Sequence, residues 1–355
     1  MWDASGLGCR ETGMGASMLT KLRFRRSRTE EPAPASERED ELTANIKAAY
    51  RFILGREADP GGIDTYRGLI TSGRMDYAQL RRVMLDSEEY ASRESRYSIV
   101  EMPHGLKVVI NPEDPEFGRA IANDGTWEPH IVDAIRSSLK PGGVFVDIGA
   151  NVGVMSFNAA DVVGPTGRVI GFEPNPRNVT VYRRGIAANG FGHVTLFPFA
   201  LSERRHMLTV TSASNGKVTG EASPTQAADV IQAVTLDEML AHEPRVDFIK
   251  IDIEGWELPA LKGSRETMRR HRPLVLCEFN PLCLRTQGQI DARELADFIF
   301  ERTEHVDLVE HDQSRTRVSS AQALMDLWGE RDEYHTSRGD LPAGWVHFDL
   351  LFRCG

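Results

Sequence analysis

The chain has 355 residues, of which 41% are hydrophobic and 26% are charged. These proportions are close to the average of globular proteins, so they exclude a wholly disordered chain, a collagen and a coiled coil. Its 42 Lys and Arg stand against 52 Asp and Glu, which gives a formal net charge of −10. Because a polyanion repels such a protein, nucleic acid is not expected as a partner.

The four cysteines have neither the C-x-x-C spacing nor the density of a disulfide scaffold, which indicates a reducing compartment. No run of about 18 apolar residues is present, and the first residues lack the apolar core of a signal peptide. We therefore expect a cytoplasmic protein without a membrane-spanning helix.

Residues 1–41 are rich in Gly, Ser, Glu and Arg and predict a disordered tail. Its basic cluster at 21–28 leaves contact with an anionic membrane open, although such charge runs are usually only solvated. Residues 42–100 repeat apolar side chains at spacings of three and four, which predicts a small helical accessory domain. Asp59 is expected to cap a helix within it.

Residues 101–355 form the third predicted segment, in which strands alternate with helices from Pro141 onward. This alternation predicts a parallel sheet that is covered by helices on both faces. Between 201 and 234 the pattern is irregular, and we expect a hairpin and loops there. The expected strands are 144–148, 168–172, 193–197, 246–251, 273–278, 306–310 and 346–352.

The segment 144–153 reads as a buried strand, a turn of small residues and the start of a helix. Gly149 permits a tight turn, Asn151 tolerates a left-handed conformation, and Gly153 permits close approach of a neighbour. Its D-x-G-x-N-x-G pattern differs from the dinucleotide fingerprint G-x-G-x-x-G. Asp147 would repel pyrophosphate, but it suits a cationic ligand such as the methionine part of S-adenosylmethionine.

The next predicted strand ends in Glu173, about 20 residues after Gly153, where an acid suits both hydroxyls of an adenosine ribose. Each feature also has a purely structural interpretation. Asp147 would then cap the following helix, Glu173 would be an exposed turn residue, and the glycines would serve packing. Their order and spacing together favour a nucleotide-type ligand.

A third cluster follows the strand predicted at 246–251. Alternation places Lys250, Asp252 and Glu254 on one face, where burial without partners is costly. One interpretation pairs Lys250 with Asp252 or Asp147, while Glu254 caps the next helix. The other places Asp252 at the ligand-binding edge of the sheet, facing an acceptor.

The strand predicted at 273–278 ends in Glu278 at the same edge of the sheet, which makes this acid a second candidate. The histidines and cysteines show no metal-ligand spacing, so we expect no metal. No G-x-S-x-G motif is present, so acyl transfer has no support either.

Residues from about 103 to 352 resemble the FkbM-type family of S-adenosylmethionine-dependent methyltransferases. The resemblance implies an α/β class I methyltransferase fold, Rossmann-like, with a seven-stranded sheet whose final strand is antiparallel, preceded here by a small all-α domain. Known members methylate hydroxyl oxygens of sugars or polyketides. The runs that carry it are DGTWE at 124–128, VDIGANVG at 146–153, GPTGRVIGFEP at 164–174, ALS at 200–202, VTLDE at 234–238 and IKIDIEG at 249–255.

The resemblance also implies roles for single residues, with S-adenosylmethionine as the cofactor. Phe199 departs from the small or polar residue expected beside adenine. Glu128 matches a recurrent acid to which no role is assigned. The residues implied to bind the cofactor are Asp147, Gly149, Asn151 and Gly153 at the methionine part, Glu173 at the ribose, and Phe199 and Ala200 at the adenine.

For catalysis, Asp252 is the first candidate as base or acceptor-orienting group and Glu278 the second, while Lys250 would hold or tune the acid. The lysine beside Asp252 lowers its basicity, which favours orientation over proton abstraction.

The helical segment resembles a domain of unknown function found beside glycan-related bacterial domains, and we expect it to dock a partner, form a homo-oligomer or present substrate. The residues that match are Tyr50, 54–56, Asp59, Gly62, Tyr66, Gly73 and 87–90.

The sequence thus predicts methyl transfer to a hydroxyl of a glycan, sugar nucleotide, lipid-linked saccharide or related metabolite. An NAD-dependent sugar-modifying enzyme is disfavoured by the missing third glycine and by the absence of a Tyr-x-x-x-Lys pair. A non-catalytic interaction module on the same fold remains the second alternative.

Overall fold

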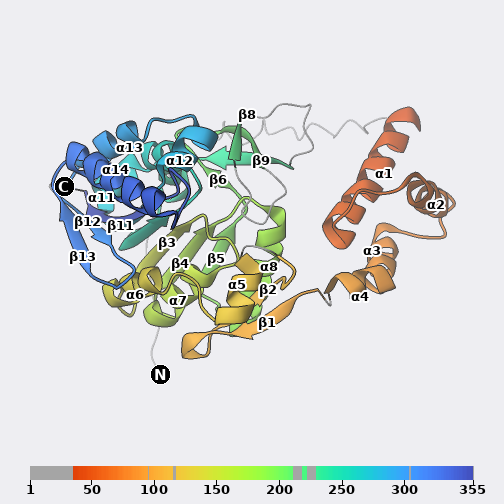
Figure 1. The fold of residues 1–355 in the computed structure, drawn as a ribbon. Coiled ribbons are helices and arrows are strands. Elements are labelled where there is room, and N and C mark those ends of the chain that lie inside the picture. Colours follow the sequence, from red (N-terminus) through yellow and green to blue (C-terminus); the bar gives the residue numbers. More distant parts are fainter. Residues whose placement is uncertain are drawn as a thin grey trace, which may run out of the picture. The chain divides into compact units, whose positions relative to one another are not determined.

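The computed structural model describes residues 35–94, 96–114, 117–210, 218–221, 229–303 and 305–354. It consists of two compact units that divide between Arg93 and Glu94, which is earlier than the predicted border after residue 100 (Figure 1). Most of the predicted tail, with its basic cluster, lies outside the described residues. Over 35–41 the tail prediction is wrong, because the first helix begins at Ala35.

The first unit is a set of short helices, as predicted. Its core contains Ile46, Tyr50 and Met84, which are almost fully buried. Asp59 caps the second helix by accepting the backbone N–H of Gly62 at 2.8 Å, which confirms the predicted cap. The elements are α1 (Ala35–Ala49), the π-helical turn η1 (Tyr50–Leu54), α2 (Pro60–Thr71), α3 (Tyr77–Leu85) and α4 (Glu88–Glu94).

The second unit is built on an eight-stranded sheet in the order β13-β12-β14-β11-β10-β3-β4-β5. The strands from β11 to β5 in this order run parallel, and β14 is antiparallel to both of its neighbours. The strands are β3 (Val144–Ile148), β4 (Arg168–Phe172), β5 (Val194–Phe197), β10 (Phe248–Ile251), β11 (Leu274–Phe279), β12 (Val306–Val309), β13 (Arg315–Val318) and β14 (Phe348–Arg353).

Seven of these strands correspond to the predicted ones and form the class I methyltransferase order. The eighth, β13, pairs antiparallel with β12 at the edge and was not predicted. Its sequence, RTRV, buries only Val318, so it lacks the apolar run by which a strand is recognised. The seven-stranded prediction is therefore one strand short.

Strands from the region predicted as hairpin and loops, 201–234, form a second, four-stranded sheet. A separate two-stranded hairpin precedes the main sheet in the chain. The elements are β1 (Ser98–Glu101), the 3-10 turn η2 (Pro103–Gly105) and β2 (Lys107–Ile110) in the hairpin, and β6 (Ala200–Leu201), β7 (His206–Val210), β8 (Val218–Glu221) and β9 (Asp229–Val234) in the second sheet.

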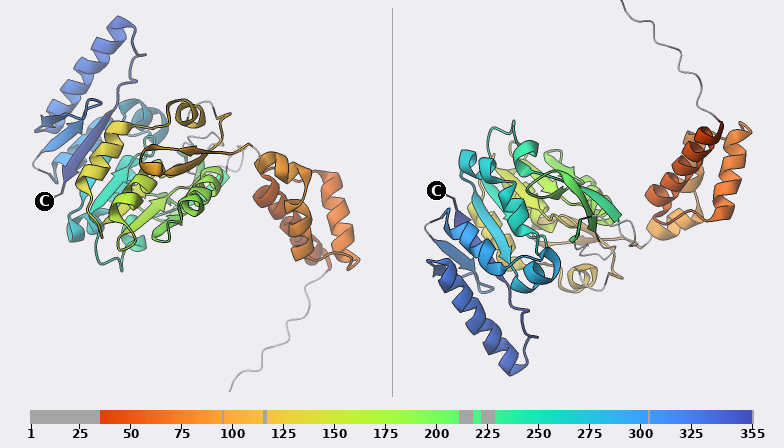
Figure 2. Two further views of the ribbon diagram at one scale, coloured as in Figure 1. Left: turned by 90° about the horizontal axis from the view of Figure 1, so that it is seen from below. Right: turned by 90° about the horizontal axis from the view of Figure 1, so that it is seen from above.

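Helices cover both faces of the large sheet (Figure 2). Two short helices lie on either side of Gly263, where only glycine fits because a Cβ would lie 2.0 Å from the carbonyl oxygen of Ser202. The helices are α5 (Phe117–Asp124), α6 (Pro129–Ser138), α7 (Val154–Val163), α8 (Pro176–Asn189), α9 (Leu236–Met239), α10 (Glu257–Lys262), α11 (Arg265–His271), α12 (Pro281–Cys283), the π-helical turn η3 (Leu284–Gly288), α13 (Ala292–Phe300) and α14 (Ala321–Arg338).

Alternation along the central strands separates two hydrophobic cores. Val146 and Ile148 of β3 pack with α10, α13 and α14 on one face. Phe145 of the same strand packs with α5, α6, α7 and α8 on the other. Among the described residues, no helix is both long and apolar enough to cross a membrane.

Gly153, where the turn after β3 enters α7, has a φ of 97°. A Cβ at this position would lie 2.2 Å from the ring of Tyr182 and 2.6 Å from that of Phe157. We therefore expect Gly153→Ala to lower the free energy of unfolding by about 2 kcal/mol or more, through strain and overpacking. Urea denaturation measures this, with Gly192→Ala as the control because nothing lies within 4 Å of that position. Equal stability of the two variants would contradict the packing role.

Candidate functional site

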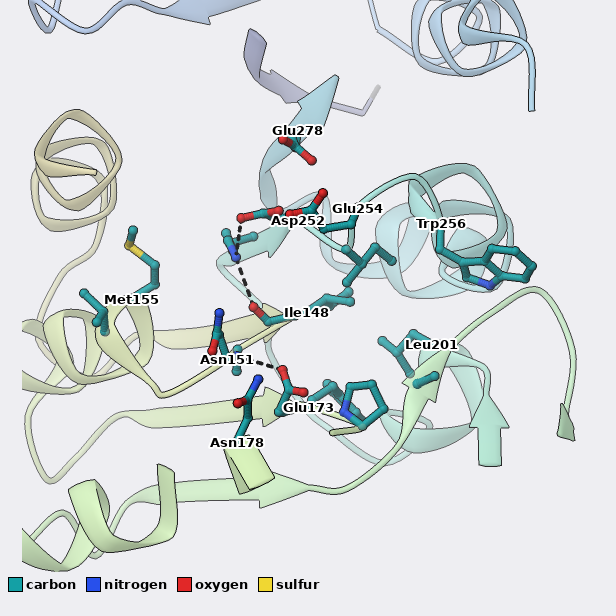
Figure 3. Close-up of a pocket in the computed structure, with 18 of the residues that line it drawn as sticks. Ile148, Asn151, Met155, Glu173, Asn178, Leu201, Asp252, Glu254, Trp256 and Glu278 are labelled. Atoms are coloured by element: carbon teal, nitrogen blue, oxygen red, sulfur yellow. Dashed lines mark hydrogen bonds and ion pairs between the residues drawn. The ribbon is translucent and has the colours of Figure 1, made fainter. Parts of the chain in front are cut away.

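A cavity of about 260 Å³ lies at the carboxyl ends of the parallel strands β3, β4, β10 and β11. This edge is where open α/β sheets bind their ligands. Figure 3 shows two groups of polar side chains in it. We call the group Asn151, Glu173 and Asn178 the Glu173 end, and the group Asp252, Glu254 and Glu278 the Asp252 end.

The turn between β3 and α7 shapes the middle of the cavity. Gly149 has a φ of 80°, and a Cβ there would lie 1.9 Å from the carbonyl oxygen of Asp252. Asn151 adopts the predicted left-handed conformation, with a φ of 49°. These conformations bring the backbone N–H of Asn151 to 2.9 Å from Oε2 of Glu173.

Glu173, at the end of β4, is the central acid of its end of the cavity. It is only 5% exposed, and it also accepts the backbone N–H of Asn175, at 2.8 Å. Burial raises the pKa of its carboxyl group to about 7, although both backbone hydrogen bonds act in the opposite direction. Phe199 and Ala200 also line the cavity, so every residue implied at the ribose or adenine borders it.

Asp147 and Gly153 do not line the cavity, contrary to the expectation that they contact the methionine part. Asp147 has no exposed surface, and its Oδ2 accepts the hydroxyl of Ser156 at 2.6 Å. In the sheet register it lies opposite Lys250, so its side chain faces the lysine beneath the turn. Burial raises the pKa of Asp147, while Lys250 opposes this shift.

Lys250 joins both ion pairs that the sequence offered as alternatives. Its Nζ lies 3.1 Å from Oδ2 of Asp252 and 3.8 Å from Oδ1 of Asp147, and it donates to the carbonyl oxygen of Gly149 at 3.2 Å. Burial lowers the pKa of this lysine, but the carboxylates of Asp252, Asp147 and Glu128 outweigh burial and raise it overall. Lys250 is therefore an ammonium that holds Asp252 in place.

Glu254 is not the N-cap residue of α10. That position is taken by Trp256, whose side chain makes no cap hydrogen bond. Glu257, which is fully buried, instead accepts the backbone N–H groups of Ile253 and Gly255, at 3.1 and 3.0 Å. This clamp fixes the loop that presents Asp252 and Glu254 to the cavity.

Glu278 reaches the cavity from β11, as the sequence predicted for the strand end. One oxygen accepts the side-chain amide of Asn280 at 3.3 Å, and the other is buried without a hydrogen-bond partner among the described residues. Burial, followed by Asp252, raises the pKa of Glu278 well above its usual range. Lys250, Asp252 and Glu278, the three predicted catalytic residues, thus line one cavity.

Several lining residues were not found as site residues in the sequence. Trp127 and Glu128 precede α6, Trp256 lies before α10, and His347 precedes β14. Among them Trp127 and Glu128 carried a signal, as part of the DGTWE run. In the described part of the chain, no group of three or more His, Cys, Asp or Glu side chains is arranged to hold a metal ion.

Comparison with sequence families connects this cavity to a chemistry. The family described as the methyltransferase FkbM domain matches residues 147–309. The region that forms most of the cavity is therefore similar to an FkbM methyltransferase domain. The match runs from β3 to β12 and so includes both ends of the cavity, whereas Glu128 and His347 lie outside it.

Three solved structures to which this chain is similar have low sequence identity with it. The methyltransferase FkbM of Methylobacillus flagellatus KT has 19% identity and a TM-score of 0.38, over 88% of this chain and 60% of its own. An S-adenosylmethionine-dependent O-methyltransferase of Thermotoga maritima has 12% identity and a TM-score of 0.36, over 72% of this chain and 77% of its own. The O-methyltransferase TomG of Streptomyces achromogenes, in complex with S-adenosylmethionine, has 12% identity and a TM-score of 0.35, over 64% and 79%.

This chain therefore spans less than two thirds of the length of the Methylobacillus protein. Among curated proteins, none matches the sequence significantly.

Proposed function

We propose that the chain transfers a methyl group from S-adenosylmethionine to a hydroxyl oxygen of a saccharide. One observation carries the proposal. An FkbM methyltransferase domain places a buried carboxylate, Glu173, and an acidic group around Asp252 at two ends of one cavity. The cavity therefore has separate places for a nucleoside and for an acceptor.

The Glu173 end fits the nucleoside part of the donor. Backbone N–H groups hold the carboxylate of Glu173 in place, and it would accept the ribose hydroxyls. Phe199 and Ala200 offer a wall to the adenine, and the turn from Gly149 to Asn151 would border the methionine part. When bound, S-adenosylmethionine supplies a methyl group that its sulfonium already makes electrophilic. The surplus of carboxylates in the cavity suits this positive charge.

The residues of the Asp252 end would place the acceptor. Methyl transfer requires the acceptor oxygen in line with the methyl carbon at roughly 3 Å, with water excluded. Asp252 is ion-paired with Lys250 at 3.1 Å, and a carboxylate held in this way is a good hydrogen-bond acceptor. Its proposed role is to orient the acceptor, and Glu278 would lie beside it.

The proposal of a saccharide acceptor combines the family resemblance with the charge of the cavity. Beyond the ion pair of Asp252 with Lys250, Glu254 and Glu278 add carboxyl groups at the same end. The first unit is proposed to present the substrate or to bind a partner protein or a second copy. We place the protein in the cytoplasm, a proposal supported by the buried thiols of the described cysteines Cys277 and Cys354.

We expect uncharged saccharides to be methylated at least about tenfold more efficiently than the same sugars carrying a phosphate or carboxylate near the reacting hydroxyl. An added negative charge would face Asp252 and Glu254, and such repulsion is large in a partly buried site. Transfer of label from methyl-labelled S-adenosylmethionine to matched sugar pairs measures this ratio. A preference for the phosphorylated partner would contradict the proposed acceptor class, and an alkali-labile label would indicate a methyl ester instead of an ether.

A further inference from the structure

Glu128 is the N-cap residue of α6, but its side chain does not stabilise the start of that helix. It precedes α6 with a φ of 42°, a left-handed conformation that costs a residue with a Cβ about 1 kcal/mol or more. Acids at such positions usually cap the helix, yet the side chain of Glu128 makes no cap hydrogen bond. Instead it lines the cavity, and Trp127 hydrogen-bonds to its carboxyl group.

The charged groups that act on Glu128 come from three elements. Asp252 and Lys250 belong to β10 and the loop after it, and Asp349 belongs to β14. Two of these partners are already engaged: Asp252 with Lys250 at 3.1 Å, and Asp349 with Nε2 of His130 at 3.1 Å. Within the described residues, no ion pair joins Glu128 itself to a basic side chain.

The acids that line this part of the cavity therefore differ in their contacts, and one of them, Glu254, accepts the thiol of Cys283 at 3.2 Å. Asp252 is engaged in an ion pair with the ammonium group of Lys250. Glu278 has one buried oxygen that is unpartnered among the described residues, and burial together with its acidic neighbours raises its pKa well above the usual range, which favours its neutral form. Burial, then Asp252 and Asp349, raise the pKa of Glu128 to about 8, which suits reversible proton uptake under ordinary conditions.

We propose that Glu128 is the catalytic base of the reaction and that Asp252 only orients the acceptor; this rests on the proposed function. The acceptor hydroxyl passes its proton to the carboxylate of Glu128, and the freed electron pair of the oxygen forms the bond to the methyl carbon. The bond from that carbon to sulfur breaks, and its electrons stay on the sulfur. Glu128 then releases the proton to solvent.

The test measures kcat at saturating S-adenosylmethionine as a function of pH. A base must be deprotonated to act, so kcat of the wild type is expected to rise about tenfold per pH unit below about 8 and to level off above it. Glu128→Gln is expected to lower kcat about 10²- to 10⁴-fold, to abolish this rise, and to leave S-adenosylhomocysteine affinity within about twofold. Glu128→Asp should restore part of the rate together with the rise.

Asp252→Asn serves as the matched variant, since it should slow the reaction and retain the rise with pH. A flat wild-type profile between pH 6 and 8 would overturn the proposal without any variant. So would a Glu128→Gln enzyme that keeps kcat within about threefold, or one that still shows the rise. Failure of the wild type to bind S-adenosylhomocysteine would instead overturn the proposed function.

Discussion

Replacement of Glu173 by alanine is expected to weaken the binding of S-adenosylhomocysteine at least about 100-fold. The variant would lose the charged acceptor of the ribose hydroxyls, and hydrogen bonds to charged groups contribute about 1.5–3 kcal/mol each. It would also leave the backbone N–H groups of Asn151 and Asn175 without their acceptor. Equilibrium dialysis with labelled ligand measures the change. Glu266→Ala removes an exposed acid on α11 and should leave the affinity unchanged.

The raised pKa of Glu173 also implies that the affinity for S-adenosylhomocysteine depends on pH. In the free protein the pKa of Glu173 is about 7, and hydroxyl donors favour its ionised form. Ligand binding therefore lowers this pKa, and affinity should fall by up to tenfold per pH unit as the pH drops below about 7. Glu173→Gln keeps the shape of the side chain and should remove this dependence. If Glu173→Ala binds S-adenosylhomocysteine within about threefold of the wild-type affinity, the ribose-binding role of Glu173 is refuted.

Lys250→Met is expected to lower the free energy of unfolding by about 3–5 kcal/mol, the usual cost of leaving buried charges without a partner. The lysine lies between Asp252 at 3.1 Å and the fully buried Asp147 at 3.8 Å. Without it, the pKa of Asp147, already raised, would rise further above its unfolded value. The deficit should therefore be larger at pH 8 than at pH 5, because protonation relieves the buried charge.

Denaturant unfolding at both pH values measures this deficit. Arg269→Met is the matched control, since it removes a cation from an exposed ion pair with Glu266 and should cost less than about 1 kcal/mol. A Lys250→Met protein as stable as this control, or one whose deficit shrinks as the pH rises, would mean that Lys250 does not neutralise buried acids.

The parts of the fold that the sequence predicted best are the buried parallel strands. The expected bounds of β3 and β4, 144–148 and 168–172, are the observed ones. Both strands are short, mostly apolar segments that begin directly after a glycine, a local signal that requires no knowledge of the rest of the chain. Because parallel strands end at a common edge, the acids Glu173, Asp252 and Glu278 were also predicted at that edge, and all three line the cavity there.

The parts that were missed depend on tertiary contacts. Asp147 is the acid expected near the end of β3, at the methionine part of the ligand. Its register opposite Lys250 instead buries its side chain inside the protein, away from the cavity. Glu128 and His347 reach the cavity from the segments before α6 and β14, far from the central motifs in sequence. Nothing local in the chain reveals these approaches, because they arise only when α6 and β14 pack against the sheet.

The most direct test of the central claim is calorimetric titration of the wild-type chain with S-adenosylmethionine, S-adenosylhomocysteine and NAD. Binding requires no knowledge of the acceptor. The account predicts micromolar affinity for the first two ligands and none for NAD, because Glu173 accepts a ribose while the acids around Asp252 repel a pyrophosphate. No binding of either S-adenosyl ligand, or binding of NAD alone, would contradict it.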